Sequence, residues 1–229
     1  MDARILVVDD EPEIAELVEV YLTNEGFSVY KCYAGTDALE LLNRQSVDLA
    51  ILDVMLPDIS GFALCGEIRK KYNFPVVMLT AKVEDADKIT GLTIGADDYV
   101  TKPFNPLELV ARVKAQLRRV TRYNEAERSS GDMIDFNGLI IDRSTHQCWL
   151  YERELPLTPL EFDILWMLCE NRGQVISAER LFETVWGEKY LDRNNTVMVH
   201  IRRLREKMGE HGRNPRFIKT VWGVGYKID

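Results

Sequence analysis

The feature that most constrains the fold is a short apolar run that leads directly into an acidic residue. Residues 49–52 are Leu, Ala, Ile and Leu, Asp53 follows at once, and Pro57 supplies a turn signal shortly afterwards. A continuous apolar run bounded by turn signals indicates a strand buried on both faces, as in a parallel sheet. Asp53 would then lie at the carboxyl end of that strand, the edge of an open α/β sheet where ligands bind. Two interpretations stay open at this point: Asp53 accepts a phosphoryl group, or it ends a strand and faces water.

The rest of the first half alternates between apolar segments and helical patterns. We expect further strands at residues 4–8, 28–32, 75–80 and 98–102. We expect helices at about residues 14–24, 37–42, 61–72 and 84–94, and a last one that opens at Asn105. Strands that alternate with helices predict an α/β fold, here a five-stranded parallel, doubly wound sheet with helices on both faces.

Polar residues follow several of these strands. Asp9 and Asp10 follow the first strand, Asp53 ends the third, Thr80 the fourth and Lys102 the fifth. All lie at carboxyl ends, so we expect them to meet on one rim of the sheet. Crowded carboxylates repel one another unless a cation is present, and a hard divalent ion such as Mg²⁺ prefers oxygen ligands. Phosphoryl transfer needs such positioning and charge neutralisation, which favours the phosphoryl-acceptor interpretation of Asp53.

Five motifs in this order resemble the receiver domain of two-component response regulators, the CheY-like or flavodoxin-like fold. They lie at residues 8–11, 52–57, 61, 79–81 and 101–104, and the resemblance covers about residues 3–121. It implies the strand order 2-1-3-4-5 and a cis bond between Lys102 and Pro103. Phosphatases of the haloacid dehalogenase class were the enzyme alternative, but they need a second Asp where this chain has Met55.

The resemblance also implies roles for single residues. Asp53 would accept a phosphoryl group from a sensor histidine kinase, with Mg²⁺ held by Asp10, Asp53 and the Met55 carbonyl and by Asp9 through water. Thr80 would bond the new phosphoryl group, and Tyr99 would turn inward as a switch. The alternative for Tyr99 is an edge-strand aromatic without a switching role.

A homodimer on phosphorylation is expected to use charges on the face of the fourth helix, fifth strand and fifth helix. The proposed pairs across a two-fold axis are Lys88 with Glu108, Asp98 with Arg112, and Asp97 with Arg119. Exposed pairs contribute only about 0–1 kcal/mol each, so they would fix register rather than affinity. The alternative is a solvated charged face.

Three segments are expected: a receiver at residues 1–120, a flexible linker at 121–131 and a second domain at 132–229. The chain carries a net charge of −8, yet residues 193–219 hold eight basic and two acidic residues. Such a local basic face indicates nucleic-acid binding better than the overall charge does.

The second domain begins with short β segments and continues with three helices and a hairpin. The β segments are expected at residues 133–136, 139–142, 147–150 and 154–157. The helices are expected to start after Thr158, a capping box with Glu161, after the cap Ser177, and at Thr196. The hairpin is expected at residues 216–228, with its turn around Trp222 and Gly223. This order predicts an α+β winged helix-turn-helix.

The third of these helices has two stripes. Its core stripe is expected to be Val197, Ile201, Leu204 and Met208. The outer face is expected to contact DNA bases through Thr196, Val199, His200 and Arg203, flanked by Arg202 and Arg205. Arginines, a hydroxyl and a methyl group suit the major groove. The alternative is a merely solvated basic helix.

Residues 157–162, 197–207 and 218–226 resemble the winged-helix effector of the OmpR/PhoB family. The resemblance implies contacts to the DNA backbone from Trp186, Arg193, Asn195 and Arg205. It implies a wing that reaches the minor groove, made by Lys219, Thr220, Trp222, Gly223 and Tyr226. One departure is Trp222, where the family often carries Arg, so minor-groove contact by this wing is in question. The loop 187–193 would contact RNA polymerase.

These resemblances together predict a DNA-binding transcriptional regulator rather than an enzyme. Residues 49–57, 87–95 and 218–228 look most similar to the VanR type, which controls glycopeptide (vancomycin) resistance genes. The alternative is an OmpR/PhoB-type regulator of another cell-envelope or nutrient response. No apolar run approaches the roughly 20 residues that span a bilayer, so we expect a cytoplasmic protein, and the four scattered cysteines are expected to be buried, reduced thiols.

Overall fold

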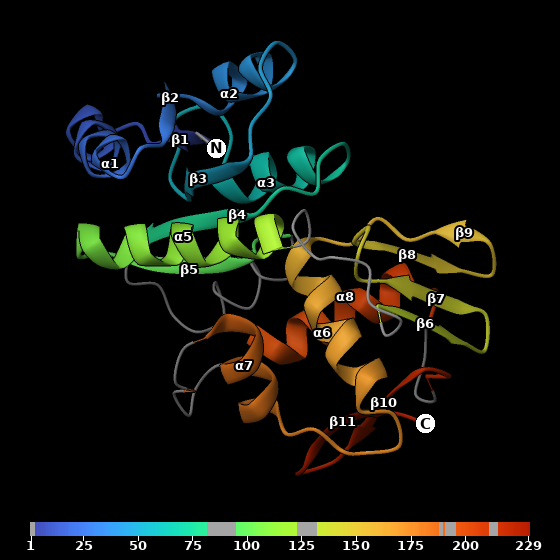
Figure 1. The fold of residues 1–229 in the computed structure, drawn as a ribbon. Coiled ribbons are helices and arrows are strands. Elements are labelled where there is room, and N and C mark those ends of the chain that lie inside the picture. Colours follow the sequence, from blue (N-terminus) through green and yellow to red (C-terminus); the bar gives the residue numbers. More distant parts are fainter. Residues whose placement is uncertain (1–2, 82–94, 123–131, 188–189, 191–195, 211–214) are drawn as a thin grey trace. The chain divides into compact units, whose positions relative to one another are not determined.

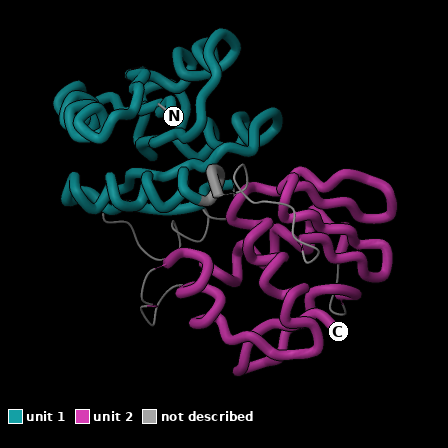
Figure 2. The backbone as a smooth tube through the Cα atoms, in the orientation of Figure 1, with its two compact units in different colours: residues 1–118 teal, residues 119–229 magenta. Residues whose placement is uncertain are grey.

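The chain forms two compact units, Met1–Arg118 and Arg119–Asp229 (Figure 2). The computed structural model describes residues 3–81, 95–122, 132–187, 190, 196–210 and 215–229, without the side chains of residues 119–122. Within these ranges, no helix combines the length and the apolar character needed to cross a bilayer. The four cysteines, Cys32, Cys65, Cys148 and Cys169, are free and buried, as predicted.

The first unit is built on a parallel sheet of five strands in the order β2-β1-β3-β4-β5 (Figure 1), which confirms the predicted order. The strands are β1 Arg4–Val8, β2 Ser28–Cys32, β3 Leu49–Asp53, β4 Val76–Ala81 and β5 Asp98–Lys102. Every residue of the central β3 is buried, as its continuous apolar sequence predicts. The edge strands β2 and β5 are partly exposed, in keeping with their more polar sequences.

Helices cover both faces of this sheet. They are α1 Pro12–Asn24, α2 Gly35–Leu42, α3 Gly61–Arg69 and α5 Pro106–Arg122. Alternate strand residues pack against α1 and α5 on one face and against α2 and α3 on the other. The doubly wound α/β fold is therefore confirmed. Helix α3 ends three residues before the predicted Tyr72, and the helix expected at 84–94 lies outside the described residues.

Helix α5 begins where Asn105 accepts a hydrogen bond from the Leu107 amide (2.9 Å), as its cap signal predicts. The helix continues through Arg122, so the first two residues of the expected linker are helical. The remaining linker residues, 123–131, lie outside the described ranges.

The second unit opens with an antiparallel sheet in the order β6-β7-β8-β9. Its strands are β6 Met133–Phe136, β7 Leu139–Asp142, β8 Gln147–Leu150 and β9 Arg153–Glu154. The last strand is shorter than the predicted 154–157, because Pro156 has no amide hydrogen for a ladder and Leu155 turns into the core.

Three helices and a hairpin complete this unit. The helices are α6 Pro159–Glu170, α7 Ala178–Trp186 and α8 Thr196–Lys207, and the hairpin strands are β10 Ile218–Val221 and β11 Gly225–Ile228. The predicted capping box of Thr158 and Glu161 is present at α6, and Ser177 caps α7. The α+β winged-helix architecture is thus confirmed.

The base of the hairpin is pinned to the rest of the unit. Ile176 and Tyr226 exchange two backbone hydrogen bonds (2.8 and 2.9 Å), which adds a short bridge to the hairpin edge. A Cβ on Gly225 would lie 2.0 Å from the Ile176 carbonyl oxygen, so this approach requires glycine. Ile218 and Ile228, paired at the open end of the hairpin, are fully buried.

Candidate functional site

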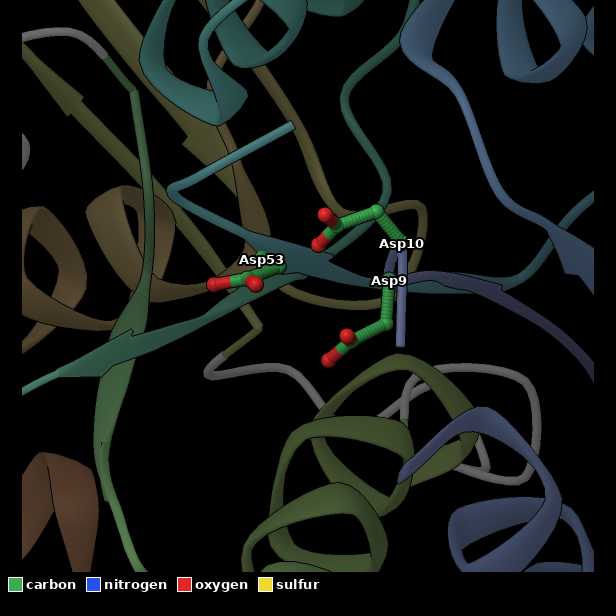
Figure 3. Close-up of side chains that lie close together, drawn as sticks. All are labelled: Asp9, Asp10 and Asp53. Carbon is green, nitrogen blue, oxygen red and sulfur yellow. The ribbon is translucent and has the colours of Figure 1, made fainter. Parts of the chain in front are cut away.

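Three carboxylates meet at the carboxyl ends of β1 and β3, which are neighbours in the sheet (Figure 3). Asp9 and Asp10 follow β1, Asp53 ends β3, and oxygens of all three lie within 4.8 Å of one another. Asp9 and Asp53 are buried, with 0% and 4% of their surface exposed, whereas Asp10 is exposed. The structure therefore brings together the three acids that strand topology predicted.

Lys102, at the end of β5, reaches into this cluster. Its Nζ lies 2.8 Å from Asp9 Oδ2, 3.0 Å from Asp53 Oδ2 and 3.2 Å from Glu11 Oε1. Burial alone lowers the pKa of Lys102, but hydrogen bonds to Asp9 and Asp53 outweigh it and leave the pKa raised. The ammonium group therefore stays charged at neutral pH. The bond between Lys102 and Pro103 is cis, as the receiver resemblance implies.

Burial raises the pKa of Asp9, although hydrogen bonds from Lys102 and from the Glu11 amide act in the opposite direction. One ammonium group cannot neutralise the three clustered carboxylates. An excess of negative charge on oxygen donors, one of them open to solvent, suits a hard divalent cation such as Mg²⁺. The donor set thus fits a magnesium ion.

The predicted signal-transmitting residues lie on the two strands beyond β3. Thr80 is buried, and its hydroxyl donates a hydrogen bond to the carbonyl of Ala81 (2.9 Å). Thr80 pairs in register with Thr101, which places it one strand from Lys102. Tyr99 is half-buried and packs against the apolar cluster beneath α2 and α3.

Gly61 is a positioning residue whose role the sequence did not reveal. Its amide donates to the Val54 carbonyl (2.9 Å), and a Cβ at this position would lie 1.9 Å from the Asp53 carbonyl oxygen. Helix α3 can therefore begin this close to the backbone of Asp53 only with glycine. The signal in the sequence was a glycine at the first turn of a helix, a position where side chains are normally tolerated.

Asp58 is a residue that the sequence did not single out. Its carboxylate accepts hydrogen bonds from the amides of Gly35 (2.9 Å) and Thr36 (2.8 Å), the first residues of α2. Those backbone bonds hold the pKa of Asp58 well below its usual range. The N-cap residue of α2, Ala34, provides no side-chain cap, so Asp58 supplies it from the loop that follows Asp53.

In the second unit, helix α8 has the core stripe that its sequence predicts. Val197, Ile201, Leu204 and Met208 are buried in the core, as predicted. The face expected to contact bases is buried as well.

The residues expected to contact bases, Thr196, Val199, His200 and Arg203, are 7%, 3%, 0% and 6% exposed. The His200 ring lies beside the Trp186 ring, with centroids 5.5 Å apart. Contact of this face with DNA bases stays a prediction. The exposed residues of α8 form a narrow stripe of Met198, Arg202 and Glu206.

Trp186 is also a core residue rather than a group open to the DNA backbone. It is 3% exposed and stacks on Phe182, with ring centroids 4.9 Å apart and planes 10° apart. Arg193 and Asn195 lie outside the described residues, as does most of the loop 187–193 expected to contact RNA polymerase.

The β10–β11 hairpin, the predicted wing, has an apolar tip. Trp222 is 90% exposed and Val224 57%, and Gly223 between them has φ +74°. The cations at the base do not reach the tip, because Lys219 and Lys227 both pair with Asp229.

Three further residues expected to contact DNA, one on α8 and two on the wing, have contacts within the chain. Arg205, expected at the DNA backbone, donates hydrogen bonds to the Ile218 carbonyl and to Thr220 Oγ1. Thr220 is therefore engaged within the chain. Tyr226 is half-buried and packs against the core of this unit.

Comparisons with known proteins agree with both halves of this geometry. Residues 5–114 match the response regulator receiver domain, and residues 152–228 match the C-terminal domain of transcriptional regulatory proteins. Over 230 aligned residues, covering 100% of each chain, the sequence is 61% identical to the regulatory protein VanRc of Enterococcus gallinarum. The chain is an OmpR/PhoB-type response regulator.

This regulator is also 56% identical to the regulatory protein VanR of Enterococcus faecium, again over 100% of both chains. Its predicted resemblance to the VanR type is thus confirmed. Among solved structures, the response regulator DrrB, described as a Thermotoga maritima OmpR/PhoB homolog, has a TM-score of 0.52 and 37% identity. That match covers 100% of this chain and 99% of DrrB.

Four of the six charges expected to pair between two copies of the regulator have partners within the chain. Arg112 lies 3.1 Å from Asp98 and 3.0 Å from Glu108, so the predicted Asp98–Arg112 pair is intramolecular. Asp97 is fully buried and binds Arg69 (2.7 Å), and its pairing with Arg119 of another copy stays a prediction. Lys88 and the Arg119 side chain are outside the described residues.

Proposed function

We propose that Asp53 is the phosphoryl acceptor of this response regulator, and that a sensor histidine kinase supplies the phosphoryl group. The observation that carries the proposal is that Lys102 Nζ contacts both Asp9 and Asp53 on one rim of the sheet. In the transfer, the phosphorus–nitrogen bond of the kinase phosphohistidine breaks and a phosphorus–oxygen bond to the Asp53 carboxylate forms. The Lys102 ammonium group would compensate charge on the arriving phosphoryl oxygens.

Asp10, Asp53 and the Met55 carbonyl, with Asp9 through water, would hold Mg²⁺. Bound there, the ion would supply positive charge for the transferring phosphoryl group. The fit of the oxygen-only donor set supports this part of the proposal. Thr80 would then exchange its bond to the Ala81 carbonyl for one to the phosphoryl group, and Tyr99 would follow into the space that Thr80 leaves.

The test is phosphorylation of the full chain by acetyl phosphate, followed by phosphate-affinity electrophoresis over a range of Mg²⁺ concentrations. We expect a shifted band that disappears in Asp53→Asn and with excess chelator. Asp10→Asn, which keeps the acceptor but lacks a ligand, should need a higher Mg²⁺ concentration. A shifted band in Asp53→Asn would refute the assignment of the acceptor.

We further propose that α8 and the wing bind promoter DNA in the cytoplasm. Arg202 lies on the exposed stripe of α8, and Trp222 occupies the wing tip, so both are available to a duplex. The identity to VanR and VanRc favours glycopeptide-resistance genes as targets over another cell-envelope or nutrient response. Footprinting of phosphorylated and unphosphorylated protein on the neighbouring promoter tests both points, and equal protection in the two samples would contradict control by phosphorylation.

Phosphorylation is proposed to act through a homodimer that also contacts RNA polymerase. Because Asp98 and Arg112 already pair within the chain, that pair would have to change partners to bridge two copies. Sedimentation of the chain with and without acetyl phosphate tests this, and a monomer under both conditions would refute the dimer.

A further inference from the structure

Arg205, near the end of α8, is bonded to the first strand of the wing. Its Nε and Nη2 donate to the Ile218 carbonyl at 3.0 and 2.6 Å, and Nη2 also donates to Thr220 Oγ1 at 2.9 Å. The side chain is half-buried. Three of the five guanidinium N–H groups are used in these bonds, which fix the plane of the group and leave only Nη1 for another partner.

The end of the same helix supplies the complementary contact. The Glu210 carboxylate accepts hydrogen bonds from the amides of Phe217 and Ile218. The N–H and the C=O of Ile218 are therefore each held by a side chain from the end of α8. Gly209, with φ +74°, turns the chain so that Glu210 faces the strand.

Arg202, one turn earlier on α8, is a natural contrast to Arg205. Its side chain is 66% exposed and pairs with Glu206 at the surface (2.9 Å). Such a surface pair contributes about 0–1 kcal/mol, so Arg202 can leave it for a DNA phosphate at little cost. Arg205 can offer a phosphate only the N–H groups of Nη1, unless it gives up its three bonds and releases the wing.

The fold of the unit does not depend on this contact alone. The base of the wing is fixed by the bridge between Ile176 and Tyr226 and by the buried side chains of Ile218 and Ile228. Arg205 binds the other strand of the hairpin, at Ile218 and at Thr220, the residue that pairs with Tyr226. Loss of this contact should therefore loosen β10 and the tip that follows it, while the Ile176 bridge keeps β11 in place.

We propose that Arg205 and Glu210 are positioning residues that fix the wing relative to α8, and that Arg205 does not itself bind the DNA backbone. We call the hydrogen bonds from Arg205 and Glu210 to β10 the clasp. With the clasp closed, α8 and the wing act as one rigid body. The clasp then sets the distance between the groove that α8 enters and the groove that the wing tip meets. The DNA part of this inference rests on the proposed function, but the clasp does not.

The first experiment uses no DNA and compares Arg205→Gln with the matched variant Arg202→Gln in the full chain. Amide hydrogen exchange of residues 219–226 should be at least about tenfold faster in Arg205→Gln, because opening of the tip no longer breaks the clasp. Exchange there should be unchanged in Arg202→Gln. Thr220→Val, which removes one of the three bonds, should show a smaller increase and serves if Arg205→Gln fails to fold. Unchanged wing exchange in the folded variants would overturn the clasp.

The second experiment measures affinity for a duplex from the promoter immediately upstream of the chain's own gene, at several salt concentrations. Each phosphate contact contributes about −0.9 to the slope of log K against log salt concentration. The slope for Arg202→Gln should therefore be less steep by about 0.9. Arg205→Gln should keep the full slope but lose hydroxyl-radical protection on the wing side of the footprint. A slope reduced as in Arg202→Gln would show that Arg205 binds phosphate and would overturn the proposal. Failure of every variant and of the unaltered chain to bind this duplex would count against the proposed promoter target, and the exchange data would still decide the clasp.

Discussion

Replacement of Gly61 by Ala gives a direct test of how the fold positions Asp53. The new Cβ would lie 1.9 Å from the Asp53 carbonyl oxygen, 2.8 Å from its carbonyl carbon and 3.0 Å from Val54 Cα. All three are backbone atoms, so no side chain can rotate away to make room. Because ordinary contacts begin near 3.4 Å, either α3 or the end of β3 must move by roughly 1.5 Å.

Two effects of different size should follow. Overpacking of this kind costs about 1–3 kcal/mol of stability. A displacement of about 1 Å in a reacting group can lower a rate by about 10²-fold, so phosphorylation of Asp53 by acetyl phosphate should slow by roughly that factor. The rate should be measured from time courses by phosphate-affinity electrophoresis, together with thermal unfolding of the same samples.

Gly26→Ala is the matched control. Gly26 has φ +85° with no atom within 4 Å of an added Cβ, so Ala there costs roughly 1–2 kcal/mol through backbone strain alone. It should lower the unfolding temperature and leave the phosphorylation rate unchanged. If Gly61→Ala also phosphorylated at the normal rate, the close approach of α3 would not position Asp53.

Three further outcomes are expected. Asp58→Asn should lower the unfolding temperature at neutral pH, and the difference from the unaltered chain should begin to shrink as the pH falls below about 4. The pKa of Asp58 is depressed in the folded state, so its contribution is present above the unfolded value of 3.8 and is lost in acid; a difference that grew in acid would contradict this. Thr158→Ala should lower the free energy of unfolding of the second unit by about 1 kcal/mol, because the Thr158 hydroxyl caps the Glu161 amide. Thr158→Ser keeps a hydroxyl and should lose much less stability. All four tryptophans lie in that unit, so their fluorescence during urea unfolding reports on it alone, and equal losses in both variants would argue against the cap. Burial raises the pKa of the Cys148 thiol to about 12, and all four cysteines are buried. A disulfide reagent at pH 8 should therefore modify no thiol in the folded chain and all four thiols after unfolding.

Local sequence patterns were enough to predict contacts whose partners are set by strand direction or by neighbours along the chain. Parallel strands bring their carboxyl ends to one edge whatever their detailed packing, so Asp9, Asp53 and Lys102 could be grouped before any contact was known. The capping box of Thr158 and Glu161 spans three residues, and its two bonds follow from helix geometry alone.

Periodicity alone does not reveal every neighbour of a helix. The pattern of α8 correctly gave the stripe with Val197 and Ile201, but it could not show that His200 also meets Trp186 from another helix. Burial is a property of the assembled unit, whereas a helical pattern records only which residues are apolar.

What the sequence by itself determined is the alternation of strands and helices, the cluster of acids and the basic segment near the end of the chain. Only the tertiary structure decided which charged side chains form their contacts within the fold. Asp97 binds Arg69 from 28 residues away, Asp58 caps a helix 23 residues before it, and Arg205 holds a strand 13 residues beyond it. A flexible charged side chain can bind any polar group that packing brings within its reach, and no local pattern encodes which group that is.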